Sequence, residues 1–263
     1  MKINFPLLAL AVGAFAIGTT EFSPMGFLPE IANDLSVSIP QAGLLISAYA
    51  VGVMIGAPLM TLWLARFPKK TALILLMAIF TIGNVLATVA PDYMSLMGAR
   101  LITSLNHGAF FGLGSVVAAS VVPKDKQASA VAMMFMGLTI ANIGGVPLAT
   151  WLSQNTSWRM AFAAISILGI MTMLALWKAL PQDHDVVKPN VAKELRVLTR
   201  APVVLALLTT VMSAGAMFAL YTYIAPSLHV FMQASPQTIT LMLVLIGIGF
   251  SIGNHFGFFL PVD

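Results

Sequence analysis

The chain contains no cysteine and very few charged residues. Of its 263 residues only 8% are charged, whereas 59% are hydrophobic, and a soluble domain carries roughly 25% charged residues. The lack of cysteine excludes disulfides, thiolate catalysis and cysteine-based metal sites. With so little charge the chain cannot cover a water-facing surface, so most of its solvent must be the lipid bilayer.

Motifs of enzymes and of ATP-driven motors are missing as well. The sequence has no Gly-x4-Gly-Lys-Ser/Thr phosphate loop, no His-Glu-x-x-His zinc motif and no Gly-x-Ser-x-Gly nucleophile elbow. The four histidines are too scattered for a metal site (His107, His184, His229 and His255). We therefore expect no enzyme activity, no metal and no cofactor. The net charge of +4 does not indicate nucleic acid, because the basic residues lie between apolar runs.

Those apolar runs are the main positive feature of the sequence. Each is long enough, at about 20 residues, to cross a hydrocarbon core roughly 30 Å thick as a helix. We predict membrane-spanning helices at residues 5–28, 41–64, 71–90, 95–119, 128–151, 160–180, 203–226 and 238–260. The first run could instead be a cleaved signal peptide, but it is too long and lacks a small-residue cleavage site. The predicted fold is therefore an all-α polytopic membrane protein.

The basic residues predict the orientation of these helices. With the N-terminus in the cytoplasm, nearly all lysines and arginines fall on the cytoplasmic side, including the loop residues Arg66, Lys69 and Lys70. Arg159 alone lies at an outer end, and Arg100 lies within a span. Cytoplasmic loops carry such an excess of positive charge in membrane proteins. We expect a multi-pass protein of a bacterial inner membrane with its N-terminus in the cytoplasm.

An internal repeat divides the chain. A shift of 197 residues brings Gly18 onto Gly215, Pro29 onto Pro226 and Gly52 onto Gly249. Duplicated sets of spans are typical of secondary transporters. Because the second copy reaches only about two spans, and doubling the shift gives about 390 residues, we expect the chain to be a truncated or frame-shifted form of a longer transporter.

The long polar segment after the sixth span separates the two copies. We predict a six-helix bundle over residues 1–180, a cytoplasmic linker over 181–202 and a partial second bundle over 203–263. Within the linker, apolar residues recur at helical spacing (Val191, Leu195 and Leu198). This pattern fits a short interfacial helix on the inner leaflet, and a plain solvated linker is the open alternative.

Three ionisable residues lie inside predicted spans. Glu21 lies about 12 Å below the outer end of the first span, counted at 1.5 Å per residue, and Arg100 enters the fourth span to a comparable depth. Such residues usually face a cavity or a partner, so we expect an ion pair or a shared polar cavity, with a packing staple as the alternative. His107 follows on the face of Arg100, about 10 Å deeper, where it could exchange a proton or only support packing. Asn106 and Asn142 are candidates for lining the same cavity.

Small residues mark two further spans. The fifth span holds Gly137, Gly144, Gly145 and Pro147. Because proline removes a backbone donor and glycine allows close approach, we expect a kink there that acts as a hinge or serves close packing. Gly52 and Gly56 give the second span a similar face for helix contact.

Four segments together resemble the major facilitator superfamily, in particular the AraJ-like and YdhP-like transporters of its drug:proton antiporter branch. They are GTTEFSPMGFLPEIA, GARLITSLNHGAFFG, GLTIANIGGVPLATWL and NTSWRMAF. The resemblance implies a bundle of six helices plus about two helices of a second bundle. It also implies roles for matching residues: Glu21 as the acid of the first span, Arg100 and Gly108 as the arginine motif linked to the proton relay, and Gly137, Gly144, Gly145 and Pro147 as the antiporter motif.

The sequence departs from that family at the loop after the second span. Residues 61–70 keep Arg66, Lys69 and Lys70 but lack the usual glycines and aspartate, which puts the charge latch of that aspartate in doubt. The resemblance implies proton-coupled efflux of a small solute, such as a drug, a sugar or a similar metabolite, by alternating access. The expected partners are that solute, protons and the lipid bilayer. The alternative is a truncated fragment that does not transport, or that serves as an interaction subunit.

Overall fold

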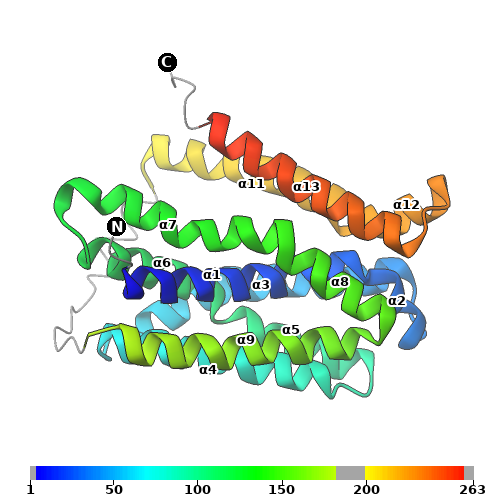
Figure 1. Cartoon of the computed structure of the whole chain (residues 1–263), viewed down its shortest axis with the longest axis horizontal. Helices are drawn as coiled ribbons and strands as arrows, with labels where there is room; N and C mark the ends of the chain where they lie inside the picture. Colours follow the sequence, from blue (N-terminus) through cyan, green and yellow to red (C-terminus); the bar gives the residue numbers. More distant parts are fainter. Residues whose placement is uncertain (1–3, 182–198, 258–263) are drawn as a thin grey trace.

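A computed structural model describes residues 4–181 and 199–257, and nearly all of these are helical (Figure 1). The N-terminal part contains α1 (Phe5–Gly26), α2 (Leu28–Asp34), α3 (Ile39–Leu64), α4 (Lys69–Thr88), α5 (Tyr93–Ser104), α6 (His107–Ser120), α7 (Gln127–Ile140), α8 (Val146–Asn155) and α9 (Trp158–Ala179). The C-terminal part contains α11 (Ala201–Thr222), α12 (Ile224–Met232) and α13 (Pro236–Gly257). We call α1–α9 the N-terminal bundle and α11–α13 the C-terminal helices.

Seven stretches of the described chain are long and apolar enough to cross a membrane. They match the first seven predicted spans to within a few residues, and the eighth predicted run forms α13. Two of the spans are each built from helices placed end to end, over Tyr93–Ser120 and Lys124–Asn155. The all-α polytopic fold is therefore confirmed. The predicted interfacial helix, at 191–198, lies outside the described residues.

The internal repeat is visible in the structure. A long helix, a short helix and a long helix follow one another in α1–α2–α3 and again in α11–α12–α13 (Figure 1). Each short helix carries one of the two prolines that the shift superposes, Pro29 in α2 and Pro226 in α12. The breaks at Phe27 and Tyr223 have non-helical dihedral angles, so α1 ends at Gly26 and α11 at Thr222, both before the predicted limits of 28 and 226.

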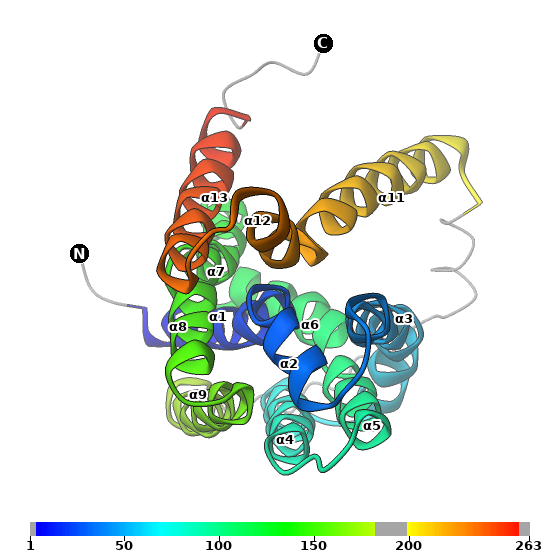
Figure 2. The ribbon, with the colours of Figure 1, turned by 90° about the vertical axis from the view of Figure 1, so that its right-hand side faces the viewer.

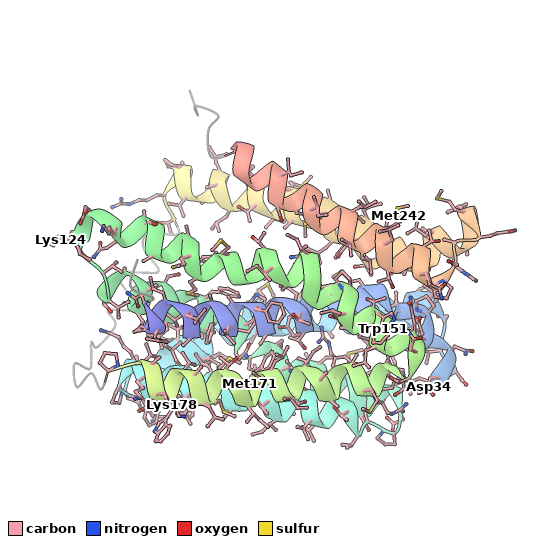
Figure 3. All side chains as sticks on the ribbon, viewed as in Figure 1. Asp34, Lys124, Trp151, Met171, Lys178 and Met242 are labelled. Atoms are coloured by element: carbon pink, nitrogen blue, oxygen red, sulfur yellow. The ribbon has the colours of Figure 1, made fainter. Side chains whose placement is uncertain are left out.

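Polar caps and basic residues lie at the two ends of the molecule. At one end, which we call the outer end, Ser38 caps α3 through a capping box with Gln41, and Asp92 caps α5 through Ser95 N at 2.8 Å. At the opposite, inner end, Lys70 Nζ donates to the Leu180 carbonyl at 2.8 Å. Lys124 and Lys178 lie at the inner end and Asp34 at the outer end (Figure 3), as the charge pattern requires.

Two hydrophobic clusters hold the helices together. The larger lies within the N-terminal bundle and includes Leu10, Phe80, Phe110 and Phe162. The smaller joins the N-terminal bundle to the C-terminal helices and includes Phe22, Ala42, Tyr221, Ala225 and Leu243. The smaller cluster is built from the outer halves of its long helices.

The two parts therefore meet at the outer end and separate toward the inner end. Only Tyr221 and Thr222, at the outer end of α11, are buried in that helix. Seen from the outer end, α11 leans away from the N-terminal bundle, while α12 lies against it (Figure 2). On α13, Ile239 and Leu243 are buried. The arrangement is closed at the outer end.

Candidate functional site

Arg100 lies in the core of the N-terminal bundle. It is only 1% exposed, and its Nη1 donates to the Thr20 carbonyl of α1 at 2.9 Å. Its guanidinium carbon lies 4.2 Å from the centre of the Tyr49 ring of α3, within the range of a cation–π interaction. Arg100 thus ties α5 to α1 and α3.

The expected ion pair between Glu21 and Arg100 does not form. Within the described chain, no nitrogen of Arg100 lies within 4.0 Å of a Glu21 oxygen. Glu21 instead faces His107, with 3.9 Å between Oε2 and Nε2. Arg100 instead donates to the Thr20 carbonyl and faces the Tyr49 ring. The arrangement corresponds to the other expectation, a shared polar site.

Tyr49 connects these groups, although the sequence did not indicate a role for Tyr49. Its hydroxyl lies 3.1 Å from His107 Nδ1, while its ring lies under Arg100. We name Glu21, Tyr49, Arg100 and His107 the polar cluster. The side chains of Glu21 and His107 are 16% and 14% exposed, so both reach a surface. The one available signal was that Tyr49 is the only tyrosine of the second predicted span.

A second pair of polar residues supports the cluster from behind. Thr20 Oγ1 donates to Asn84 Oδ1 at 2.6 Å, and Asn84 Nδ2 donates to the Phe80 carbonyl at 2.9 Å. Thr20 and Asn84 are both fully buried. Because Arg100 binds the carbonyl of Thr20, this pair fixes the acceptor that positions the guanidinium.

The break between α5 and α6 decides where His107 points. α5 ends at Ser104 and α6 begins at His107, so a single continuous helix over 95–119 was not fully right. The break packs against the small-residue face of α3. A Cβ added at Gly52 would lie 1.9 Å from Ser104 Oγ, and one at Gly56 would lie 2.9 Å from Leu105 Cα. The close approach predicted for Gly52 and Gly56 is present.

The fifth span is interrupted where its glycines predict a kink. Residues Ala141–Gly145 form a π-helical turn, and Pro147 is the second residue of α8. A Cβ at Gly137 would lie 2.0 Å from the Ala11 carbonyl oxygen, and one at Gly145 would lie 2.2 Å from Thr19 Oγ1. A Cβ added at Gly144 would have no described atom of another element within 4 Å, so Gly144 does not serve close packing here.

Two buried amides lie at these helix interruptions. Asn106 is fully buried at the α5–α6 break, and neither of its amide atoms has a hydrogen-bond partner in the described part of the chain. Asn142 lies in the π-helical turn, where its Nδ2 donates to the Leu138 carbonyl and its Oδ1 has no partner among the described residues. Neither residue is hydrogen-bonded to the polar cluster within the described chain. Orphaned polar atoms are costly, which makes both amides candidates for binding a polar ligand.

The basic loop after α3 lies at the inner end, away from the polar cluster. The Arg66 guanidinium carbon lies 5.2 Å and 5.5 Å from the ring centres of Trp63 and Phe67. Lys70 binds the end of α9, and Lys69 begins α4. Over residues 4–181 and 199–257, no group of three or more metal-ligating side chains occurs.

Known proteins are similar to this chain in sequence and in fold. The sequence model of the Major Facilitator Superfamily matches residues 10–261. The chain belongs to this superfamily. Superfamily membership confirms the predicted resemblance.

Three relatives illustrate the similarity. The inner membrane transport protein YdhP of Escherichia coli K12 is 67% identical over 98% of this chain and 66% of its own length. The putative transporter AraJ of the same organism is 36% identical over 94% of this chain and 63% of its own length. The chloramphenicol resistance protein of Streptomyces lividans is 32% identical over 93% of this chain and 63% of its own length. The chain thus spans slightly less than two thirds of the length of these relatives.

A solved structure supports the fold. A bacterial homologue of the human lysosomal transporter Spinster, in an inward-facing and unoccupied conformation, superposes with a TM-score of 0.76 at 19% identity. The match covers 97% of this chain and 61% of that one. Together with the membrane spans and the similarity to YdhP, this makes the chain a multi-pass protein of the inner membrane.

Proposed function

We propose that this chain forms part of a secondary active transporter that exports a small solute in exchange for protons. The observation that carries the proposal is the polar cluster, in which an acid of the first span meets a guanidinium and an imidazole of the fourth around a tyrosine of the second. Ionisable groups within a membrane are expensive, and they mark ion and substrate pathways.

The chemistry of the cluster suits proton exchange. Glu21 Oε2 and His107 Nε2 lie 3.9 Å apart, so the charge of each group acts on the protonation of the other. A protonated His107 beside an ionised Glu21 is an ion pair, and a further proton on Glu21 removes the attraction that holds it. Arg100 supplies a fixed positive charge behind the Tyr49 ring, so the charge of the cluster depends on how many protons it holds.

The arrangement of the two parts supports alternating access. We propose that the bundle of residues 1–180 rocks against the helices of 203–263, with 181–202 as the connection. Contact at the outer end and separation toward the inner end fit the state of a transporter that is open to the cytoplasm. Gly52, Gly56, Gly137, Gly145 and Pro147 line the helix contacts and interruptions that such rocking would use.

Side chains near the polar cluster and the names of the relatives support a substrate class. Asn106 and Asn142 offer unpaired amide atoms, and aromatic rings lie beside the cluster, since His107 lies 5.2 Å from Phe111, which stacks on Phe135. A small amphipathic solute that combines rings with hydrogen-bonding groups suits side chains of these types. The chloramphenicol resistance protein among the relatives makes an antibiotic of that kind a first candidate.

The test is solute efflux from cells that express this chain. We expect loaded cells to lose at least one solute of a drug and sugar panel faster than cells without the chain, and an uncoupler to remove the difference. Glu21→Gln should also remove it, because the amide cannot exchange a proton. Asp92→Asn is the matched control, since Asp92 is an exposed helix cap and asparagine also caps helices.

Efflux that continues unchanged in Glu21→Gln would exclude the proton role of Glu21. Absence of efflux for every solute, with the chain present in the membrane, would favour the alternative of a fragment that does not transport or that serves another subunit.

A further inference from the structure

The contact that closes the outer end is made by a small set of side chains, which we call the outer seam. Phe22 of α1 stacks on Phe218 of α11 with ring centres 5.5 Å apart, and the Tyr221 ring meets Phe22 edge-on at 5.9 Å. Gly43 of α3 lies against Tyr223, where an added Cβ would be 2.6 Å from the hydroxyl. These contacts are apolar and closely packed, so any charge placed beside them affects whether the seam closes.

Glu30 is the acid placed beside this seam. It lies on α2, which packs against α12 of the C-terminal helices (Figure 2). Its Oε2 is buried and has no hydrogen-bond partner in the described part of the chain. Burial raises the pKa of Glu30, and a hydrogen bond from its own backbone and the nearby His229 oppose this rise. An ionised Glu30 is therefore poorly accommodated when the seam is closed.

The other ionisable groups around Glu30 are accounted for. His229 of α12 is the neighbouring base and is exposed. Asp34, also on α2, accepts hydrogen bonds from Arg159 and from Trp158 Nε1, the latter at 3.0 Å, and the Arg159 contact lowers its pKa. Tyr223 places its hydroxyl on Gly43 of α3. Asp34 thus stays ionised at the pH values at which Glu30 would titrate.

We propose that Glu30 is a proton sensor on the outer surface whose protonation favours the closed outer seam. In the closed seam the carboxyl is buried with its Oε2 unpaired, whereas opening of the seam would expose the carboxyl to water. The closed state therefore binds the proton more tightly, so its advantage is full at acidic pH and is lost as the pH rises through the pKa of the closed state. The effect reaches about tenfold in the closing equilibrium for each unit by which the two pKa values differ.

This sensor is distinct from the polar cluster. Glu30 lies outside the membrane-spanning helices, whereas Glu21 lies within α1. It would make an acidic exterior favour the state that is open to the cytoplasm, whether or not Glu21 carries the transported proton.

The experiment uses the fact that the chain has no cysteine of its own. Ala225→Cys places a single thiol in the seam, at a residue that is 1% exposed, and Met232→Cys places one on the same helix at a residue that is 68% exposed. A membrane-impermeant thiol reagent is added from outside to the full chain in membranes between pH 5 and 8. The ratio of the two labelling rates removes the intrinsic pH dependence of thiol reactivity.

We expect the ratio of seam to control labelling to rise with pH by about tenfold per unit of pKa difference. It should stay low and flat when Glu30→Gln is added, because the amide mimics the neutral carboxyl. In His229→Gln the rise should move to higher pH, since a base that favours the ionised acid has been removed. If the seam thiol is damaging, Ala42→Cys offers a second reporter on α3, at a fully buried position.

Two results would overturn the proposal. One is a ratio that does not change with pH in the protein with an intact Glu30. The other is a rise that persists unchanged in Glu30→Gln, because another group would then be the sensor. Neither readout requires transport, so loss of the sensor and loss of proton-coupled efflux are separate findings.

Discussion

At the scale of residues, Tyr49 organises the polar cluster although it carries no charge. Its ring faces the guanidinium of Arg100 and its hydroxyl faces His107 Nδ1. The hydrogen bond at Nδ1 leaves Nε2 for Glu21, and a partner at one ring nitrogen sets which atom carries the proton. Tyr49 therefore positions the imidazole rather than exchanging protons itself.

Removing only the hydroxyl separates these two contacts. Tyr49→Phe should keep the ring beneath Arg100 but lose the bond to His107, which is worth about 0.5–1.5 kcal/mol. We expect efflux to fall about three- to tenfold and its pH profile to move, as measured in the same cells across a pH series. Tyr93→Phe is the control, because the Tyr93 hydroxyl bonds to the Gln41 carbonyl at the outer end. A Tyr49→Phe profile identical to that of the parent chain would contradict the positioning role.

The sequence identified the charged members of the cluster but not their neutral partners. Glu21, Arg100 and His107 could be identified because ionisable residues within an apolar run are rare and usually functional. Tyr49, Thr20 and Asn84 could not, since neutral polar residues are common in membrane helices. The sequence left an ion pair and a shared polar cavity open, because depth along two helices does not say which way each side chain turns. Arg100 turned toward the Thr20 carbonyl and Tyr49.

At the scale of elements, the spans themselves were predictable from length and apolar composition, and their interruptions only in part. The prolines and glycines indicated the π-helical turn at Ala141–Gly145. The break between Ser104 and His107 had no such signal. It depends on the backbone of Leu105 lying against Gly56 of another helix, which is a tertiary contact. Local sequence cannot encode a break of that kind.

Gly137 and Gly144 form a matched pair for testing the contact between α1 and the fifth span. Gly137→Ala places a methyl group against the Ala11 carbonyl, whereas Gly144→Ala meets no described atom within 4 Å. Overpacking typically costs about 1–3 kcal/mol, so we expect Gly137→Ala to lower the melting temperature in detergent by about 2 to 10 °C. Gly144→Ala should change it by much less. Equal melting temperatures for the two variants would contradict the close approach.

At the scale of the whole molecule, the charge pattern predicted the topology and the repeat predicted the two related sets of helices. Lys124 and Lys178 lie at one end and Asp34 at the other, as expected (Figure 3). The closure of the outer end was not predictable. The proposed alternating access requires two states that differ by only a few kcal/mol, and one sequence would encode both. In this structure the packing of Phe22 on Phe218 closes the outer end.

The central claim is that protons are exchanged at the polar cluster, and proton movement in liposomes tests it most directly. Purified chain is reconstituted with a pH-sensitive dye inside, and a gradient of the exported solute is imposed. The account predicts that protons move in the direction opposite to the solute, which the dye reports as a change of internal pH. This change should persist in Asp92→Asn and be lost in Glu21→Gln. Solute flow without any pH change, or the same pH change in Glu21→Gln, would contradict it.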